Sequence, residues 1–331
     1  MLSFDSMKLE SSFSKCFNDF SINHQRIEKH TLQKEGIDTL KYRVNCKDIT
    51  GLKNIEYLPE KDSIIIELSG KILGKDYPLL INQNTIIQAL EGINQNECLT
   101  INPDQVLENA VIHSIDCTKD IHLEQYTTRD VLDVLNVMTN RSYKLVEYPT
   151  EGVFITKIAR SNNKLLKFYD KDLEMMLSRN DDIRKQVKPD SFHNAIRSEL
   201  CLRKHDFIRK DFNINHKGSV YLKEALLSRM NPNHKFWIDF LNPVPYLFEE
   251  YDQSYSLEEI IRIEGIKGII HQLRNDQKLI LNFIMKYRKE KNEAYRVLKK
   301  TFRPIIEQEQ NKIHPKYTEI QEFISQSLLV N

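Results

Sequence analysis

Glycine, cysteine motifs and long apolar runs are all scarce in this chain of 331 residues. Its nine glycines form neither G-x-G-x-x-G nor G-x-x-x-x-G-K-[ST], so nothing supports nucleotide chemistry of the Rossmann or P-loop kind. Five scattered cysteines without a C-x-x-C pair argue against a disulfide framework or a thiolate zinc site. No apolar run is long enough to span a membrane, and no basic segment with an apolar stretch opens the chain. We therefore expect a cytoplasmic protein with reduced cysteines and no membrane partner.

An excess of charge of one sign is also missing. The 48 Lys and Arg residues balance 47 Asp and Glu residues, which by itself argues against a nucleic-acid-binding protein. The charges are unevenly distributed, however: residues 51–150 carry about −7, whereas 151–217 and 266–303 carry about +5 and +8. An acidic block followed by two basic blocks suits a metal site beside DNA-binding surfaces. Ordinary solvated helix faces produce the same pattern.

The first two thirds of the chain mix strand and helix patterns. Alternating, β-branched segments predict strands at 37–44, 63–68, 111–117, 152–158, 165–169 and 195–203. The polar residues 160–163 predict a hairpin between two of these strands. Amphipathic runs at 86–90 and 131–138 predict helices between them. We expect an α+β fold over residues 1–240, with a mainly antiparallel central sheet and flanking helices.

The last third has a helical pattern throughout. It follows a proline-containing break at 242–245, and Ser256-Leu257-Glu258-Glu259 matches a capping box. Basic residues crowd the segment 286–303. We expect a helical accessory domain over 246–331 whose basic face, with Lys286, Arg288 and Lys289, binds DNA.

Three predicted strands each carry one carboxylate among apolar neighbours: Glu67, Asp116 and Glu199. Carboxylates are depleted in strands, and three on neighbouring strands would repel one another unless a divalent cation or arginines balanced them. Alternation places Arg197 and Arg203 on the face of Glu199, where they could bind phosphate. The solvent face of a one-sided sheet is the alternative interpretation.

Alternation makes a further prediction about the strand that carries Asp116. It places Ile112 and Ser114 on the same face as Asp116 and directs His113 to the opposite face. We therefore interpret His113 as a structural histidine rather than a metal ligand.

A tyrosine stands where the predicted strand 165–169 passes into a polar, helical stretch. A phenol has a pKa of about 10 and is a poor nucleophile at neutral pH unless it is activated. Lys167 and Lys171 lie two residues to either side of Tyr169, on its face if the segment is extended. Either ammonium could stabilise a phenolate or steer a phosphodiester. A half-buried strand tyrosine between solvated lysines is the alternative.

The ordered set of these motifs resembles the gene II (and gene X) replication initiation proteins of filamentous phages and the related rolling-circle plasmid Rep proteins. The resemblance is carried by Tyr-Asp-Lys-x-x-Glu from Tyr169 and Ile-Arg-Ser-Glu-Leu-Cys-Leu-Arg at 196–203. Upstream, 65–69 is similar to the family's Val-Glu-Ile-Lys-Ala segment, and 112–116 is similar to its Arg-Ile-Asp strand. Order and spacing agree over residues 60–210.

The resemblance implies site-specific nicking of one DNA strand at a phage or plasmid origin. Tyr169, assisted by Lys171, would attack the scissile phosphate and leave a 5′-phosphotyrosine with a free 3′-OH. Asp116, Glu199 and Glu67 would hold Mg²⁺ or Mn²⁺, and Arg197, Arg203 and Lys167 would bind phosphate. The implied partners are supercoiled and single-stranded origin DNA, a host helicase and polymerase, and a second copy in a homodimer.

The chain also departs from that family pattern. Ser114 stands where the family has an arginine, and a His-hydrophobic-His strand is missing because His122 stands alone. A two-histidine metal site is therefore not supported. Tyr143 or Tyr148 could be a second tyrosine for strand closure, and spacing does not choose between them. Two alternatives stay open: a non-enzymatic DNA-binding replication or regulatory protein, and a relaxase- or transposase-like nickase.

Overall fold

A computed structural model describes residues 2–21, 24–34, 37–138, 143–148, 152–157, 163–177, 180–241, 262, 266, 269, 277–287, 290–304 and 317–329. Its strands are β1 (Phe4–Ser12), β2 (Phe17–Phe20), β3 (Ile27–Lys34), β4 (Ile37–Val44), β5 (Leu52–Leu58), β6 (Ser63–Ser69), β7 (Leu99–Ile101), β8 (Val111–His122), β9 (Tyr143–Tyr148), β10 (Gly152–Lys157), β11 (Lys164–Asp170) and β12 (Ala195–Leu202). Its α-helices are α1 (Phe13–Cys16), α2 (Ile86–Ile93), α3 (Pro103–Asn109), α4 (Thr128–Val137), α5 (Lys171–Met175), α6 (Asp181–Arg184), α7 (His205–Asp211), α8 (Leu222–Leu227), α9 (Pro232–Leu241), α11 (Gln277–Tyr287), α12 (Lys291–Val297) and α14 (Tyr317–Leu329). Short 3-10 segments include η1 (Pro59–Lys61), η2 (Gly70–Leu79), η3 (Asn94–Asn96) and η5 (Pro189–Phe192), and a π-helical turn, η6, covers Leu298–Phe302.

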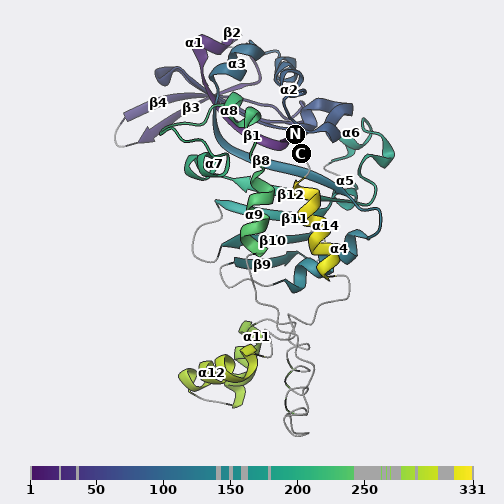
Figure 1. The fold of residues 1–331 in the computed structure, drawn as a ribbon. Helices are drawn as coiled ribbons and strands as arrows, with labels where there is room; N and C mark the ends of the chain where they lie inside the picture. Colours follow the sequence, from purple (N-terminus) through teal and green to yellow (C-terminus); the bar gives the residue numbers. More distant parts are fainter. Residues whose placement is uncertain are drawn as a thin grey trace. The chain divides into compact units, whose positions relative to one another are not determined.

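Ten strands form one antiparallel sheet in the order β3-β4-β5-β6-β1-β8-β12-β11-β10-β9 (Figure 1). Strands β2 and β7 form a separate pair. The predicted α+β fold, with a large antiparallel sheet and flanking helices, is thereby confirmed, as is the hairpin pairing of β10 with β11. The topology places β1 between β6 and β8, and β12 between β8 and β11. Segments far apart in the sequence therefore become neighbours at the centre of the sheet.

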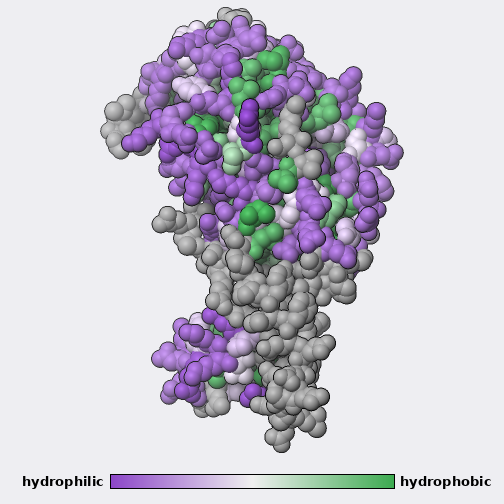
Figure 2. Space-filling model, viewed as in Figure 1, coloured by the Kyte–Doolittle hydropathy of each residue, from purple (hydrophilic) through white to green (hydrophobic). Residues whose placement is uncertain are grey.

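One face of the sheet forms the hydrophobic core. Helix α9 packs on it, and the Trp237 ring lies 5.4 Å from the Phe168 ring of β11, edge to face. Burying each such side chain contributes about 1.5–3 kcal/mol. Trp237 Nε1 donates a hydrogen bond to Ser325 Oγ of α14 over 2.8 Å, which holds α14 beside α9. On the side of the first unit seen in Figure 2, exposed hydrophobic residues form small separate patches in a mostly hydrophilic surface.

The pairing of β1 with β8 contains a β-bulge. Lys8 lies opposite Ser114, but the next residue, Leu9, lies opposite Ile112, so His113 is the extra residue of β8. Strict alternation along β8 fails at this point. Ile112, which alternation placed on the face of the β8 carboxylate, is fully buried in the core. The His113 ring contacts a carboxylate of β1 instead of entering the core.

The chain divides into two compact units. The first contains residues 1–136, 140–242 and 322–331, and the second contains 137–139 and 243–321. The predicted accessory domain, 246–331, is corrected at its end, because 322–331 belong to the first unit through the packing of α14. In the second unit, α11, α12 and η6 surround a small core of Ile266, Ile280, Ile284, Ala294 and Phe302.

Two further predictions concern membranes and cysteines. None of the helices in the described part of the chain combines the length and apolar character that a membrane span requires. All five cysteines are buried and free, as expected from their scattered positions.

Candidate active site

The candidate site lies on the face of the sheet opposite the core, across β8, β12 and β11. Glu199 of β12 pairs with Lys167 of β11, and Cys201 of β12 pairs with Asp116 of β8. Directly paired residues in antiparallel strands point to the same face, and alternation adds Tyr169 two residues after Lys167. The register thus brings together side chains that lie far apart in the sequence.

Glu199 is the centre of this group. Tyr169 Oη donates a hydrogen bond to Glu199 Oε2 over 3.0 Å, and Lys167 Nζ donates one to Glu199 Oε1 over 2.5 Å. Burial, and next the Glu199 carboxylate, raise the pKa of Tyr169 well above its usual value. Burial lowers the pKa of Lys167, but Glu199, Cys201 and Asp116 together raise it by more, so the net pKa is raised. The resting site therefore holds a neutral phenol and an ammonium on one carboxylate.

A second carboxylate completes a group of potential metal ligands. Among the described residues, Asp116, Glu199 and Cys201 offer ligand atoms that all lie within 4.8 Å of one another, and all three residues are buried. Burial, and next the charge of Glu199, raise the pKa of Asp116. Arg203 Nη1 lies 2.8 Å from Asp116 Oδ1 as an ion pair. That buried oxygen accepts no hydrogen bond of good geometry from the described groups.

This donor set fits a hard divalent cation at its two carboxylates. Mg²⁺ and Mn²⁺ prefer carboxylate oxygens, and a cation would relieve the repulsion that raises the pKa of Asp116. The Cys201 thiol is a soft ligand that suits such ions poorly, and its Sγ lies 3.4 Å from Glu199 Oε1. The residues whose ligand atoms suit Mg²⁺ or Mn²⁺ are therefore Asp116 and Glu199.

Glu67, the third predicted ligand, is not brought into this group. It lies on β6, which is separated from β8 by β1. Glu67 Oε1 stands 4.0 Å from Lys53 Nζ in a partly exposed pair.

Arg197 corrects an expectation drawn from the sequence. Its side chain is completely buried, and it makes two hydrogen bonds to the carboxylate of Asp120, of 2.6 and 2.7 Å. It also donates to Asp5 Oδ1 and to Tyr77 Oη, each over 2.7 Å. A guanidinium enclosed in this way holds β1, η2, β8 and β12 together and is not open to a DNA phosphate. Strand alternation correctly identified the face of the sheet on which Arg197 lies, but it did not identify the residues that bury the guanidinium.

Lys171 is corrected for a related reason. Strand β11 ends at Asp170, whose side chain caps α5 by accepting a hydrogen bond from Leu173 N over 2.9 Å. Lys171 is therefore the first helical residue and does not follow strand alternation. Its Nζ donates to Tyr77 Oη over 2.9 Å and to Glu174 Oε2 over 2.6 Å. Burial, and next the charge of Arg197, lower the pKa of this ammonium to about 8.

The buried network of Asp5, Tyr77 and Asp120 around Arg197 was missed by the sequence analysis. These residues share no motif, and Asp5 lies in an irregularity of the β1–β8 pairing. The one signal in the sequence that could have indicated a buried partner is the charge of Arg197 in the middle of a predicted strand.

The other predicted DNA-binding residues lie in different places. The Arg203 and Lys167 side chains are 38% and 23% exposed, so both border the candidate site from the solvent side. Lys286 is exposed on α11 of the second unit. Arg288 and Lys289 lie outside the described residues.

The two candidates for a second tyrosine also differ. Tyr143 is buried on the core face, where its ring lies 5.4 Å from that of Phe236 and 5.5 Å from that of Phe240. Burial raises the pKa of Tyr143 to about 12. It therefore lies on the side of the sheet opposite Tyr169. The side chain of Tyr148 lies outside the described residues.

No protein-family model matches the sequence, and no curated protein matches it. One similar solved structure is the rolling circle replication initiator protein from Geobacillus stearothermophilus. The two share 14% identity at a TM-score of 0.30, over 61% of this chain and 75% of that one. This similarity is too low to establish a common fold, so the architecture rests on the strand pairing itself.

Proposed function

We propose that this chain is a rolling-circle replication initiator of the phage gene II or plasmid Rep type, which nicks one DNA strand through Tyr169. The observation that carries the proposal is the hydrogen bond from Tyr169 Oη to Glu199 Oε2, in a cluster that also contains Asp116. A phenol needs a base to become a nucleophile, and a carboxylate at hydrogen-bond distance can accept its proton.

The proposed reaction is a transesterification. Tyr169 Oη attacks the phosphorus of a phosphodiester while its proton passes to Glu199 Oε2. A P–Oη bond forms, the P–O3′ bond breaks, and the 3′-oxygen takes up a proton from water to become a free 3′-OH, which balances the proton released by Tyr169. One phosphodiester is exchanged for another, so the reverse attack by a 3′-OH rejoins the strand without ATP. A chain without a P-loop is compatible with this chemistry.

Asp116 and Glu199 would hold the Mg²⁺ or Mn²⁺ that this chemistry requires. Such an ion, when bound, neutralises charge that develops on the phosphoryl oxygens. Lys167 and Arg203, at the exposed border of the site, would hold the phosphates of the strand. Lys167 would also keep Glu199 in place beside Tyr169.

The proposed partners follow from the reaction. Supercoiled origin DNA is the substrate for nicking, and the displaced single strand is the substrate for rejoining. A host helicase and polymerase would extend the 3′-OH, and a second copy of the chain would supply another tyrosine in a homodimer. The basic residues of the second unit, Lys286 among them, would bind the duplex.

The decisive experiment uses a supercoiled plasmid carrying the DNA that encodes and flanks this chain, with Mn²⁺ or Mg²⁺. After denaturation, protein covalently attached to a nicked strand is detected by its altered mobility. We expect adducts with the native chain and none with Tyr169→Phe, which still binds the DNA. Tyr143→Phe is the matched control and retains adduct formation, because Tyr143 lies on the other face. Binding with a steep salt dependence but no adduct would instead identify a non-enzymatic DNA-binding protein.

A further inference from the structure

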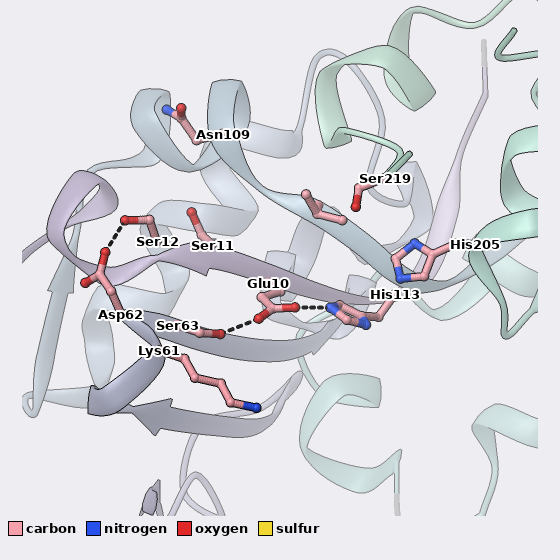
Figure 3. Close-up of a pocket in the computed structure, with 11 residues that line it drawn as sticks. Glu10, Ser11, Ser12, Lys61, Asp62, Ser63, Asn109, His113, His205 and Ser219 are labelled. Atoms are coloured by element: carbon pink, nitrogen blue, oxygen red, sulfur yellow. Dashed lines mark hydrogen bonds and ion pairs between the residues drawn. The ribbon is translucent and has the colours of Figure 1, made fainter. Parts of the chain in front are cut away.

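A polar cavity lies on the first unit, at the end of the sheet where β1, β6 and β8 meet η1 and α7 (Figure 3). Its volume is about 310 Å³, and its walls include Glu10, Lys61, Asn109, His113 and His205. The proposed nicking reaction uses none of these residues.

A hydrogen-bonded chain forms one wall of the cavity. The Glu10 carboxylate accepts a hydrogen bond from Ser63 Oγ at one oxygen and is bonded to His113 Nε2 at the other (Figure 3). A carboxylate only accepts, so Nε2 of a neutral His113 carries the proton and donates it to Glu10. The other ring nitrogen, Nδ1, is then an acceptor. Glu10 thus fixes the orientation of the imidazole as well as its hydrogen-bonding pattern.

A second imidazole stands against the first. The rings of His113 and His205 have centroids 4.9 Å apart and are inclined by 64°. The Nδ1 atom of His205 is buried and has no hydrogen-bond partner among the described residues. Leaving such an atom unpaired is unfavourable, so a ligand that bonds to it would be favoured. Burial, and next His113, lower the pKa of His205.

The composition of the walls indicates a neutral, flat and polar ligand. Two carboxylates, Glu10 and Asp62, oppose a free anion, although Lys61 partly offsets them. Ser219 offers a hydrogen-bond donor and acceptor in addition to the two imidazoles, and Asn109, whose amide nitrogen donates to Gln105, offers its amide oxygen as an acceptor. Aromatic rings beside such groups are the means by which proteins hold unstacked nucleobases.

The position of the cavity connects it with the candidate active site. Glu10 and Lys8 lie on the same face of β1. Lys8 pairs with Glu67 of β6 and with Ser114 of β8, and Ser114 shares its face with Asp116. His205 follows two residues after Arg203, the arginine bound to Asp116. A strand held at Tyr169 and continuing past Arg203 would therefore arrive at this cavity.

We propose that the cavity receives one unstacked nucleobase of the DNA strand bound at Tyr169 and recognises it through His113, His205 and Asn109. The identification of the ligand as part of a DNA strand rests on the proposed function. The recognition of a base does not require cleavage, so the proposal of base binding and the proposal of nicking can be refuted independently.

The first experiment uses the full chain with ¹³C-labelled histidine and follows the ring signals by NMR. The probes are the four deoxynucleosides, which carry no phosphate, and inorganic phosphate alone. The ring signals of His113 and His205 are identified by their loss in His113→Gln and His205→Gln. We expect at least one nucleoside to shift these two signals and to leave the signal of His216 unchanged. His216 is a control because it is bonded to Glu224, away from the cavity lining.

A blocking variant tests the same cavity with a folded protein. Ser219 is exposed at the wall, so Ser219→Trp fills the space without disturbing the core. Lys217→Trp, two residues earlier and outside the lining, is the matched control. We expect Ser219→Trp to abolish the nucleoside shifts and to weaken binding of a short single-stranded homopolymer of the preferred base by about fivefold or more. Lys217→Trp retains both.

The outcomes separate the proposals. Histidine shifts caused by phosphate alone, or no shift with any nucleoside, would overturn the assignment of a base. Equal homopolymer affinity of Ser219→Trp and Lys217→Trp would also overturn it. The measurements are repeated in Tyr169→Phe, where base binding persists if the cavity is independent of the nicking chemistry. Nucleoside binding by a native chain that forms no adduct refutes only the proposed nicking.

Discussion

Tyr169 and Glu199 lie on neighbouring strands, and the phenol of one donates a hydrogen bond of 3.0 Å to the carboxylate of the other. They are diagonal neighbours rather than direct partners, since Glu199 lies opposite Lys167. Glu199 therefore accepts a hydrogen bond from the Tyr169 phenol at Oε2 and one from the Lys167 ammonium at Oε1. In the proposed reaction, Glu199 is both the acceptor for the phenol proton and one half of the predicted metal site.

The carboxylate pair predicts a metal-dependent stability. Because the pKa of Asp116 is raised, its ionisation costs folding free energy as the pH rises through and above its usual range. We expect Asp116→Asn to raise the Tm at pH 7 without metal. Mn²⁺ should stabilise the native chain by about 2.7 kcal/mol at one hundred times its Kd, and should leave Asp116→Asn unchanged. Thermal melts with and without Mn²⁺ measure both effects.

Glu67→Gln is the control for that experiment, because Glu67 lies outside the ligand group. It should keep the full response to Mn²⁺. A lost response in Glu67→Gln, or a retained one in Asp116→Asn, would mean that the ion binds elsewhere.

The buried network predicts a loss of stability in acid. Burial raises the pKa of Asp5, but Arg197, Lys171 and the Tyr77 hydroxyl together lower it from 3.8 to about 2. The stabilisation is present above pH 3.8 and is lost as the pH falls toward 2. Asp5→Asn should therefore lower the free energy of unfolding by about 2 kcal/mol at pH 7. Urea unfolding at several pH values should show this difference shrinking toward pH 2.

Asp48→Asn provides a matched control, since the Asp48 side chain is 78% exposed. It should unfold like the native chain at every pH. If Asp5→Asn shows a difference that does not depend on pH, the hydrogen bond rather than the charge of Asp5 provides the stabilisation.

The two arginines of the segment 196–203, Arg197 and Arg203, predict different phenotypes. Removing the buried guanidinium in Arg197→Met leaves the Asp120 and Asp5 carboxylates without their partner and should cost about 3–5 kcal/mol. Arg203→Ala should cost clearly less than Arg197→Met, because the Arg203 side chain is 38% exposed, although the buried Asp116 carboxylate loses its ion-pair partner. Its salt-dependence slope for single-stranded DNA should instead fall by about 0.7. Thermal melts and DNA titrations at several salt concentrations test the pair, and similar melts for both variants would contradict the assignment.

The second unit predicts a separate contribution to duplex binding. Lys286→Glu should weaken duplex affinity and lower the salt slope by about 0.9 if Lys286 contacts one phosphate. Lys75→Glu, an equal change of charge at an exposed position of η2 in the first unit, is the control. Titration of a labelled duplex at several salt concentrations measures the slopes. A slope that is the same in both variants and the native chain would assign Lys286 to solubility alone.

Much of the fold could be predicted from local patterns. Alternation found the strands that became β6, β8, β11 and β12, and it placed Glu199 and Arg197 on one face, because a strand repeats every two residues. It failed at His113, where a bulge inserts one residue, and at Lys171, where the strand gives way to a helix. Both failures have the same cause, since alternation holds only while the backbone stays extended and in register.

The sequence by itself determined the antiparallel α+β class, the mid-strand carboxylates and the tyrosine at a strand end. Only the tertiary structure decided which of them meet. Strand order brings Asp116, Glu199 and Tyr169 together and leaves Glu67 beyond β1. It also encloses Arg197 with Asp5 and Asp120, which turns an expected phosphate ligand into a structural ion pair. Side-chain period is a local property of the backbone, whereas strand order and burial depend on contacts between distant segments.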